Sequence, residues 1–411
     1  MRILIMTDSP FIHSGQARVG REIAIGLARR GHELGYIGLF HPAEIHPNLP
    51  HNILYWWTNN NLYGSDILDT AVSKFQPEVV LTIGDFWNIG WITDLNICRT
   101  RRTFQWCSYI PVDGEPYSGG LPPGIIRTVE DIDIPIAYTE YAKRAVLKSC
   151  MDEETRGRLQ VIYHGVDTNI FKPADPAVRR KARENLGIQD KFIFLTVCRN
   201  QNRKNIPKMF QAWKAFSNLP EFKDNVIFWP HMNFNDSMGW HIDDIIDELQ
   251  IRNESIMYYN QAAYSQHDTH LIQESQLAEL YQIADAFVLL SGEGFGLPTF
   301  EAMATKLPCI LINHSASGEL GADGRAHLIN DVYYQTWTGR QLTERPSVEI
   351  NSVVEAYSKI YKDKVYRDIT AQRGYDFATK YTWDRVTGEW DNVFRFFEMP
   401  FIKPLRMEVV V

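Results

Sequence analysis

The sequence predicts an α/β protein of two doubly wound, Rossmann-like domains. The chain has 411 residues, which is too long for one ordinary core and fits two domains of roughly 150 to 200 residues each. Short apolar runs alternate with helical patterns along the chain, as they do in parallel sheets with crossover helices. These runs form two series. Residues 164–176 separate them, with Gly165, Pro173, Pro176 and no clear periodicity.

The first series begins at the N-terminus. Residues 3–6 are a short apolar run, followed by a loop with Ser14 and Gly15 and a helical pattern over residues 17–29 that Gly31 closes. Further strands of this series are predicted at residues 35–40, 79–83, 103–109 and 134–138. We assign the series to an N-terminal domain over residues 1–170.

The second series is assigned to a C-terminal domain over residues 171–384. Its predicted strands are 192–197, 225–230, 286–290 and 308–312, with helical patterns at 207–217 and 275–283. A last helical pattern at 383–397 is rich in Trp and Phe, so we expect it to dock on another surface. Ligands of open α/β sheets bind beyond the carboxyl ends of the strands, which directs attention to the loops there.

Charge and cysteine content exclude several classes of function. The formal net charge of −8 gives no general basic field, so nucleic acid is not expected as a partner. No apolar run approaches the roughly 18 residues of a membrane span, and the apolar run at the N-terminus is too short for a signal-peptide core. Five cysteines without a CxxC pair favour a reducing compartment. We therefore expect a cytoplasmic protein that is soluble or in peripheral contact with a membrane.

The strongest chemical signal follows the predicted strand at 286–290. Three glycines are followed by Pro298 at a helix start, where backbone N–H groups favour an anion. Glu293 and Glu301 flank this loop and can accept hydrogen bonds from hydroxyl groups. The alternative is that Glu301 only balances the helix dipole and the glycines only form a turn. That alternative does not explain two carboxylates around one glycine loop.

The segment with Glu293 and Glu301 resembles the E-x7-E signature of the retaining glycosyltransferases of family 4, also called group 1, which have the two-domain GT-B fold. Residues 161–167, with Phe171 and Pro173 following, resemble the interdomain segment of that family. Arg199 and, five residues later, Lys204 resemble the pair that grips the pyrophosphate of the donor.

The resemblance implies a hexosyltransferase that moves a sugar from a nucleoside diphosphate donor with retention of configuration. Glu293 would hold the transferred sugar and Glu301 the ribose of the nucleotide. It also implies domains that face each other across a cleft, with the acceptor on the N-terminal side and a C-terminal helix, about residues 385–411, packed back on it. The residues implied in donor binding in the C-terminal domain are Arg199, Lys204, Gly294, Phe295, Gly296, Leu297 and Glu301.

A departing nucleoside diphosphate accumulates negative charge, which cationic side chains stabilise by charge-assisted hydrogen bonds. We therefore expect neither a metal nor another cofactor. Asp131 and Asp133 have the spacing of a metal-binding DxD pair, but they lead into a predicted strand. His41, His46 and His51 fit no common metal geometry and are interpreted as solvent-exposed histidines.

The N-terminal half resembles the family less closely. The first loop has Ser14 and Gly15 where the family has two glycines, and Gly15 is assigned the phosphate-binding role. Asp113 stands where family members often have a histidine near the transferred sugar, so Asp113 joins Glu293 as a catalytic candidate. An aspartate before a glycine is also a common turn residue, and this alternative stays open.

Two other functions fit the same sequence. A nucleotide-sugar epimerase would also place an anionic ligand in such a fold, and a non-catalytic GT-B-like subunit could support an active partner. Intact Glu293, Glu301, Arg199 and Lys204 argue against a non-catalytic subunit. The sequence does not identify the base or sugar of the donor, and it leaves open whether the acceptor is a carbohydrate, a lipid-linked group or a protein.

Overall fold

A computed structural model describes residues 1–41, 49–59, 62–94, 103–237, 239–257, 273–336 and 343–397. The chain divides into two compact units. Unit 1 comprises residues 1–83, 96–106 and 383–411, and unit 2 comprises residues 84–95 and 107–382. The predicted domain boundary at residue 170 stays a prediction.

Unit 1 is built on parallel strands with the order β3-β2-β1-β4. Its elements are β1 (Arg2–Asp8), α1 (Gly15–Arg29), β2 (Glu33–Leu39), β3 (Leu54–Trp57), α2 (Leu68–Phe75), β4 (Val79–Ile83) and α16 (Trp383–Phe397). Helix α16 packs on α1: Arg30 donates to Asp384, and His32 pairs with Asp391 at 2.8 Å. The buried side chains of Trp390 and Phe394 anchor α16 in this unit.

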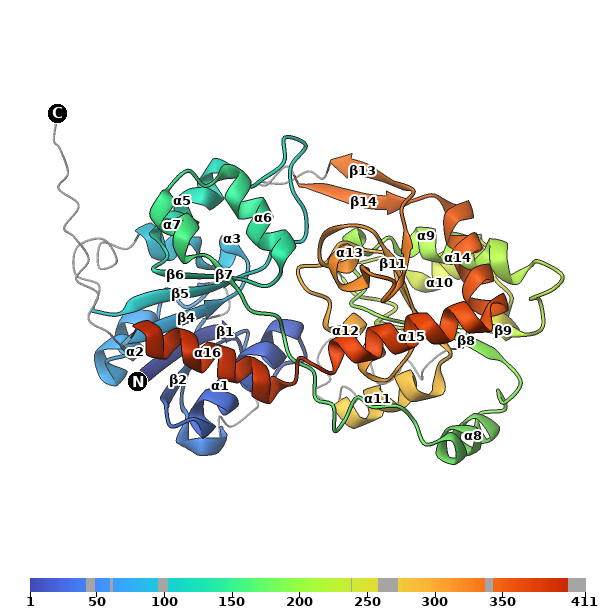
Figure 1. The fold of residues 1–411 in the computed structure, drawn as a ribbon, viewed down its shortest axis with the longest axis horizontal. Coiled ribbons are helices and arrows are strands. Elements are labelled where there is room, and N and C mark those ends of the chain that lie inside the picture. Colours follow the sequence, from blue (N-terminus) through green and yellow to red (C-terminus); the bar gives the residue numbers. More distant parts are fainter. Residues whose placement is uncertain are drawn as a thin grey trace. The chain divides into compact units, whose positions relative to one another are not determined.

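Unit 2 contains two groups of parallel strands, with the orders β5-β6-β7 and β12-β11-β10-β8-β9, and an antiparallel hairpin of β13 and β14 (Figure 1). Its strands are β5 (Gln105–Ile110), which begins in unit 1, β6 (Ile134–Ala137), β7 (Gln160–Val161), β8 (Phe192–Val197), β9 (Val226–His231), β10 (Ala286–Leu289), β11 (Cys309–Ile312), β12 (His327–Ile329), β13 (Val332–Thr336) and β14 (Glu344–Val348).

Helices cover these strands, as expected for crossover connections between parallel strands. They are α3 (Phe86–Ile89), α5 (Pro123–Asp131), α6 (Glu140–Ser149), α7 (Glu153–Arg158), α8 (Pro176–Asn185), α9 (Ile206–Ser217), α10 (Ile242–Glu248), α11 (Glu274–Ile283), α12 (Leu297–Ala304), α13 (Ser315–Gly321), α14 (Ile350–Lys362) and α15 (Lys364–Ala378). Trp213, Phe194 and Tyr357 pack edge to face in the core between β8, α9 and α14.

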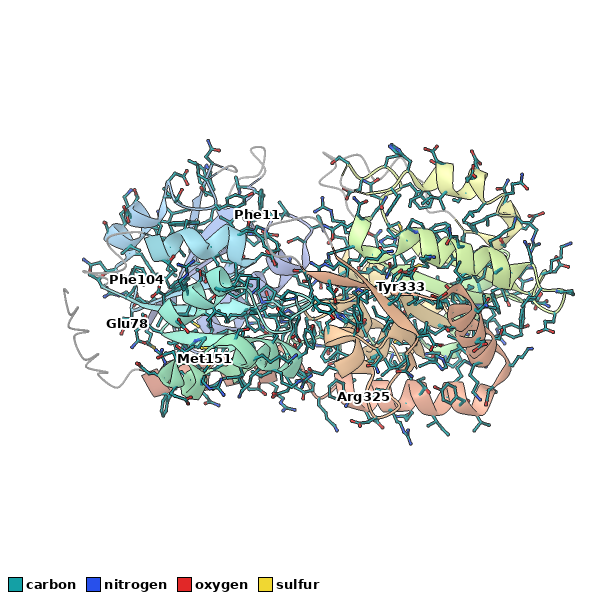
Figure 2. The ribbon with its side chains drawn as sticks, turned by 90° about the horizontal axis from the view of Figure 1, so that it is seen from above. Phe11, Glu78, Phe104, Met151, Arg325 and Tyr333 are labelled. Atoms are coloured by element: carbon teal, nitrogen blue, oxygen red, sulfur yellow. The ribbon has the colours of Figure 1, made fainter. Side chains whose placement is uncertain are left out.

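The strands predicted from apolar runs are all present, with ends that differ by at most two residues. Strands β3, β7, β12, β13 and β14 were missed, because β7 and β12 have only two and three residues and the other three lack a buried apolar run. Strand β3 is exposed or half-buried throughout. On β13, Tyr333, labelled in Figure 2, is half-buried and Tyr334 is exposed.

The structure also bears on the predictions for the cysteines, the histidines and membrane-spanning segments. Cys107, Cys198 and Cys309 are buried free thiols. His51 is exposed and His46 lies outside the described residues, but His41 is half-buried among aromatic rings, so the interpretation of His41 as solvent-exposed is wrong. Within the described ranges, no helix is long and apolar enough to cross a membrane.

Candidate active site

The first part of the site is the loop that follows β8. Asn205 fixes this loop, because its side-chain amide donates to the carbonyl oxygens of Leu290 and Pro346, each at 2.7 Å. Its φ of 54° is a left-handed conformation that asparagine adopts more readily than most residues. The loop is thereby tied to the end of β10 and to β14, and Lys204 is buried beside it.

The second part is the glycine loop between β10 and α12. Two serines of α13 hold it in place. Ser315 Oγ accepts from the backbone N–H of Glu293 at 2.9 Å, and the hydroxyl of Ser317 donates to the carbonyl oxygen of Ser291 at 2.8 Å. The loop ends at Gly296, whose φ of 98° suits glycine and which precedes α12 directly.

Glu293 lies at the centre of a group of charges that are buried or half-buried. Lys204 Nζ contacts its Oε1 atom, and the hydroxyl of Ser291 donates to the same oxygen. Arg203 Nη1 lies 3.7 Å from Oε2 of Glu293 and donates to the carbonyl oxygen of Gly292 at 3.1 Å. The side chains of Lys204 and Glu293 are 8% and 10% exposed, so these charges depend on one another rather than on water.

Asp113 joins the same group of charges. Its carboxylate lies 2.7 Å from Arg345 Nη1 and 3.7 Å from Arg203 Nη1. Arg345 comes from the hairpin, whose Glu344 N–H donates to the carbonyl oxygen of Glu115 at 3.0 Å. A Cβ at Gly292 would lie 2.9 Å from the carbonyl oxygen of Asp113, so the glycine loop also packs closely on this segment.

We call Asp113, Arg203, Lys204, Glu293 and Arg345 the charge cluster. Its three cations outnumber its two carboxylates, so it has a net positive charge when each group is ionised. Burial by itself raises the pKa of Glu293, but Lys204 and Arg203 outweigh it and lower that pKa to about 2. Glu293 is therefore a carboxylate at neutral pH. An anion that entered the cluster would find cations already held in place.

Comparison with known proteins bears on this arrangement. Residues 255–336, which include Glu293 and Glu301, match the model of the family described as glycosyl transferases group 1. We call residues 255–336 the group 1 region, after the family model that they match. Mannosylfructose-phosphate synthase from Agrobacterium fabrum is 25% identical over 180 residues, which are 43% of this chain and 37% of that protein. The chain spans only 37% and 55% of the lengths of the two curated relatives that it matches.

Solved structures are similar over almost the whole chain. Sucrose-phosphate synthase from Thermosynechococcus elongatus has a TM-score of 0.73 at 16% identity and covers 97% of this chain and 98% of its own. The Anabaena protein HepE in complex with UDP-glucose has a TM-score of 0.70 at 15% identity, with 96% and 100% covered. These likenesses confirm the predicted fold, which is of the GT-B type.

Not every residue predicted from the group 1 resemblance lies in the charge cluster. Lys204, Glu293 and Asp113 do. Arg199 is 61% exposed and pairs with Asp236 at 2.9 Å. Glu301 is buried and accepts a hydrogen bond from the hydroxyl of Tyr281 at 2.8 Å.

The predicted loop residues take different positions around the group 1 region. Phe295 is buried against the rings of His164 and Phe300, so only its backbone is available to a ligand. Gly294 packs against Pro111, and Leu297 is the first residue of α12. Gly15 is the first residue of α1 in unit 1. The roles assigned to these residues stay predictions.

The sequence did not single out Arg203 and Arg345. Arg203 directly precedes Lys204 in the basic loop, and that proximity was the available signal. Arg345 lies in no recognisable sequence motif. It reaches Asp113 only because the hairpin of β13 and β14 brings it there. Within the described part of the chain, no three His, Cys, Asp or Glu side chains gather in a way that could hold a metal ion.

The buried pair leads to a pH-dependent prediction. Replacing Lys204→Met leaves the Glu293 carboxylate with only part of its compensation, so the free energy of unfolding at neutral pH should fall by about 3 kcal/mol. In the wild type, the lowered pKa of Glu293 stabilises the fold above its ordinary value of 4.5, and this contribution is lost as the pH falls toward 2. In the variant, the pKa of Glu293 rises, so the deficit in the free energy of unfolding should shrink as the pH falls below that raised pKa and toward 2.

Urea unfolding at neutral and at mildly acidic pH measures this effect. Lys364→Met is the matched control, because Lys364 pairs with Asp368 on the surface and is 74% exposed. Its loss should change stability by less than about 1 kcal/mol. Equal losses in the two variants, or a deficit in Lys204→Met that grows at low pH, would contradict the central role of the buried pair.

Proposed function

We propose that this chain is a retaining hexosyltransferase that moves a sugar from a nucleoside diphosphate donor to an acceptor. The observation that carries the proposal is the charge cluster at the glycine loop of the group 1 region. A buried lysine and two half-buried arginines beside a carboxylate suit a ligand that joins a diphosphate to a sugar. The Anabaena structural neighbour is described with UDP-glucose, which makes UDP-glucose the first donor to test.

In the proposed reaction, the bond between the anomeric carbon and the diphosphate oxygen breaks, and the bond to the acceptor oxygen forms on the same face of the sugar. The acceptor proton passes to an oxygen of the departing diphosphate. Lys204 and Arg203 would neutralise the charge that develops on this leaving group, so the proposal includes no metal. Glu293 would accept hydrogen bonds from hydroxyl groups of the transferred sugar.

Arg203 takes a larger part in this proposal than Arg199. Arg203 Nη1 is fixed by the carbonyl oxygen of Gly292 and lies near both carboxylates of the charge cluster. The guanidinium of Arg199 is mostly in water and is held by Asp236. We therefore assign to Arg203, with Lys204, the main contacts with the diphosphate.

Asp113 is proposed to act near the anomeric carbon, where Arg203 and Arg345 hold its carboxylate. Glu293, Glu301, Arg199 and Lys204 are all present in the sequence, and their presence supports an enzyme over a non-catalytic subunit. The buried free thiols fit the cytoplasmic location that we propose.

Ligand binding tests the donor site. Among UDP, GDP and ADP, we expect one nucleotide to raise the melting temperature of the wild type by a few degrees at about 100 times its dissociation constant. Arg203→Ala and Lys204→Ala should each lower the affinity for this nucleotide by about tenfold or more, since each removes a charge-assisted contact. The matched control Arg199→Ala should lower the affinity for the nucleotide by less than about threefold.

The outcomes of this measurement test the donor site and the assignment of the two arginines separately. A large loss in Arg199→Ala with none in Arg203→Ala would reverse the assignment of the arginines but keep the donor site. No stabilisation by any of the three nucleotides would remove the proposed function.

A second prediction separates transfer from binding. Asp113→Asn should lower the rate of UDP release from UDP-glucose, in the presence of a panel of sugar acceptors, by about a hundredfold or more. The affinity for UDP should change by less than about threefold, because Asp113 is not assigned to the nucleotide. Glu115→Gln, two residues along and paired with Lys148 instead, is the control. An equal loss of UDP affinity in Asp113→Asn would show that Asp113 serves binding.

A further inference from the structure

Unit 1 carries a group of aromatic rings that the donor site does not use. The rings of His41 and Trp57 are stacked with centroids 5.3 Å apart and planes at 25°, and those of Tyr55 and Trp57 are stacked at 6.2 Å and 27°. Phe11, labelled in Figure 2, packs edge to face on Tyr55 at 5.5 Å. We call His41, Tyr55 and Trp57 the aromatic platform.

The platform lies at the carboxyl ends of parallel strands. Asp8 at the end of β1 aligns with Leu39 of β2, and Trp57 at the end of β3 aligns with Gly38. His41 lies two residues beyond the end of β2. This edge of a parallel sheet is where open α/β folds place ligands.

Polar groups lie beside the rings. The hydroxyl of Tyr55 is 2.8 Å from Nδ1 of His41 and 3.0 Å from Oγ of Ser9. Ser9 is fully buried and holds the hydroxyl of Tyr55 in place, whereas the half-buried side chains of Tyr55 and His41 can exchange hydrogen bonds with a hydroxyl. The platform therefore joins a flat apolar face to a small set of hydrogen-bonding atoms and carries no permanent charge.

A purely structural explanation covers part of this arrangement. Strand β3 is the first in the strand order of unit 1, and large side chains commonly shield such an edge. A side chain that only shields the edge of the sheet would be expected to pack its ring against the protein. Trp57 is 53% exposed, although its ring lies nearly parallel to the rings of His41 and Tyr55.

We propose that the aromatic platform binds an uncharged sugar ring by stacking it on Trp57, with Tyr55 and His41 beside the ring hydroxyls. A pyranose has C–H groups on its faces and hydroxyls around its rim, which matches an exposed aromatic face with polar neighbours. The absence of a permanent charge favours a neutral ring over a phosphate. Assigning this sugar to the acceptor rests on the proposed function, whereas the binding itself does not.

Saturation-transfer NMR of the full chain with glucose, mannose and maltose, without nucleotide, tests the platform. We expect transfer from the protein to at least one of these sugars. Trp57→Ala should lower the affinity for that sugar by about fivefold to tenfold, the range expected for one aromatic contact. Trp57→Phe should restore most of the affinity. Leu54→Ala is the matched control, since Leu54 lies on the same strand, points to the other face and is 52% exposed.

The outcomes separate this proposal from the donor site. No transfer to any of the three sugars, or equal losses in Trp57→Ala and Leu54→Ala, overturns the platform. Melting temperatures with UDP, recorded on the same samples, should be unchanged by Trp57→Ala. If sugars bind through Trp57 but no nucleotide stabilises the chain, the proposed function falls and the platform stands. If nucleotides bind and Trp57→Ala does not change sugar binding, the aromatic platform falls and the proposed function stands.

Discussion

The contact between Lys204 and Glu293 is the interaction on which the rest of the site depends. Two opposite charges that are almost fully buried are tolerated only when geometry and further hydrogen bonds offset their lost hydration. Ser291 supplies a hydrogen bond to Glu293, and Arg203 lies near its other oxygen. The local backbone is organised to keep these groups together.

This requirement explains features of the fold that look unrelated in the sequence. Asn205 ties the basic loop to the end of β10 and to β14, so that Lys204 and the glycine loop are set by the same hydrogen bonds. Ser315 holds the backbone of Glu293 from α13. The hairpin brings Arg345 to Asp113, which gives the second carboxylate its own partner. A ligand diphosphate would then exchange partners with carboxylates that already hold the cations in place, and little reorganisation would be needed.

The sequence predicted the sheets and the glycine loop because both leave local patterns. Buried parallel strands are continuous apolar runs, and the loop after β10 combines glycines, a proline and two carboxylates within a few residues. It predicted Lys204 and Glu293 through their motifs. It singled out Arg199 and not Arg203, because spacing identifies a position in a motif but not the direction of a side chain. In the structure Asp236 pairs with Arg199, and Gly292 accepts a hydrogen bond from Arg203. Arg345 and the aromatic platform depend on contacts between distant segments, and no local pattern records those.

The central claim is that the charge cluster is the site of the donor diphosphate, and a structure of the chain with UDP bound tests it most directly. The account predicts that oxygens of the terminal phosphate lie within hydrogen-bond distance of Lys204 and Arg203, with the contact between Lys204 and Glu293 opened and Arg199 still on Asp236. A UDP molecule bound with no phosphate contact to Lys204 or Arg203 would contradict it.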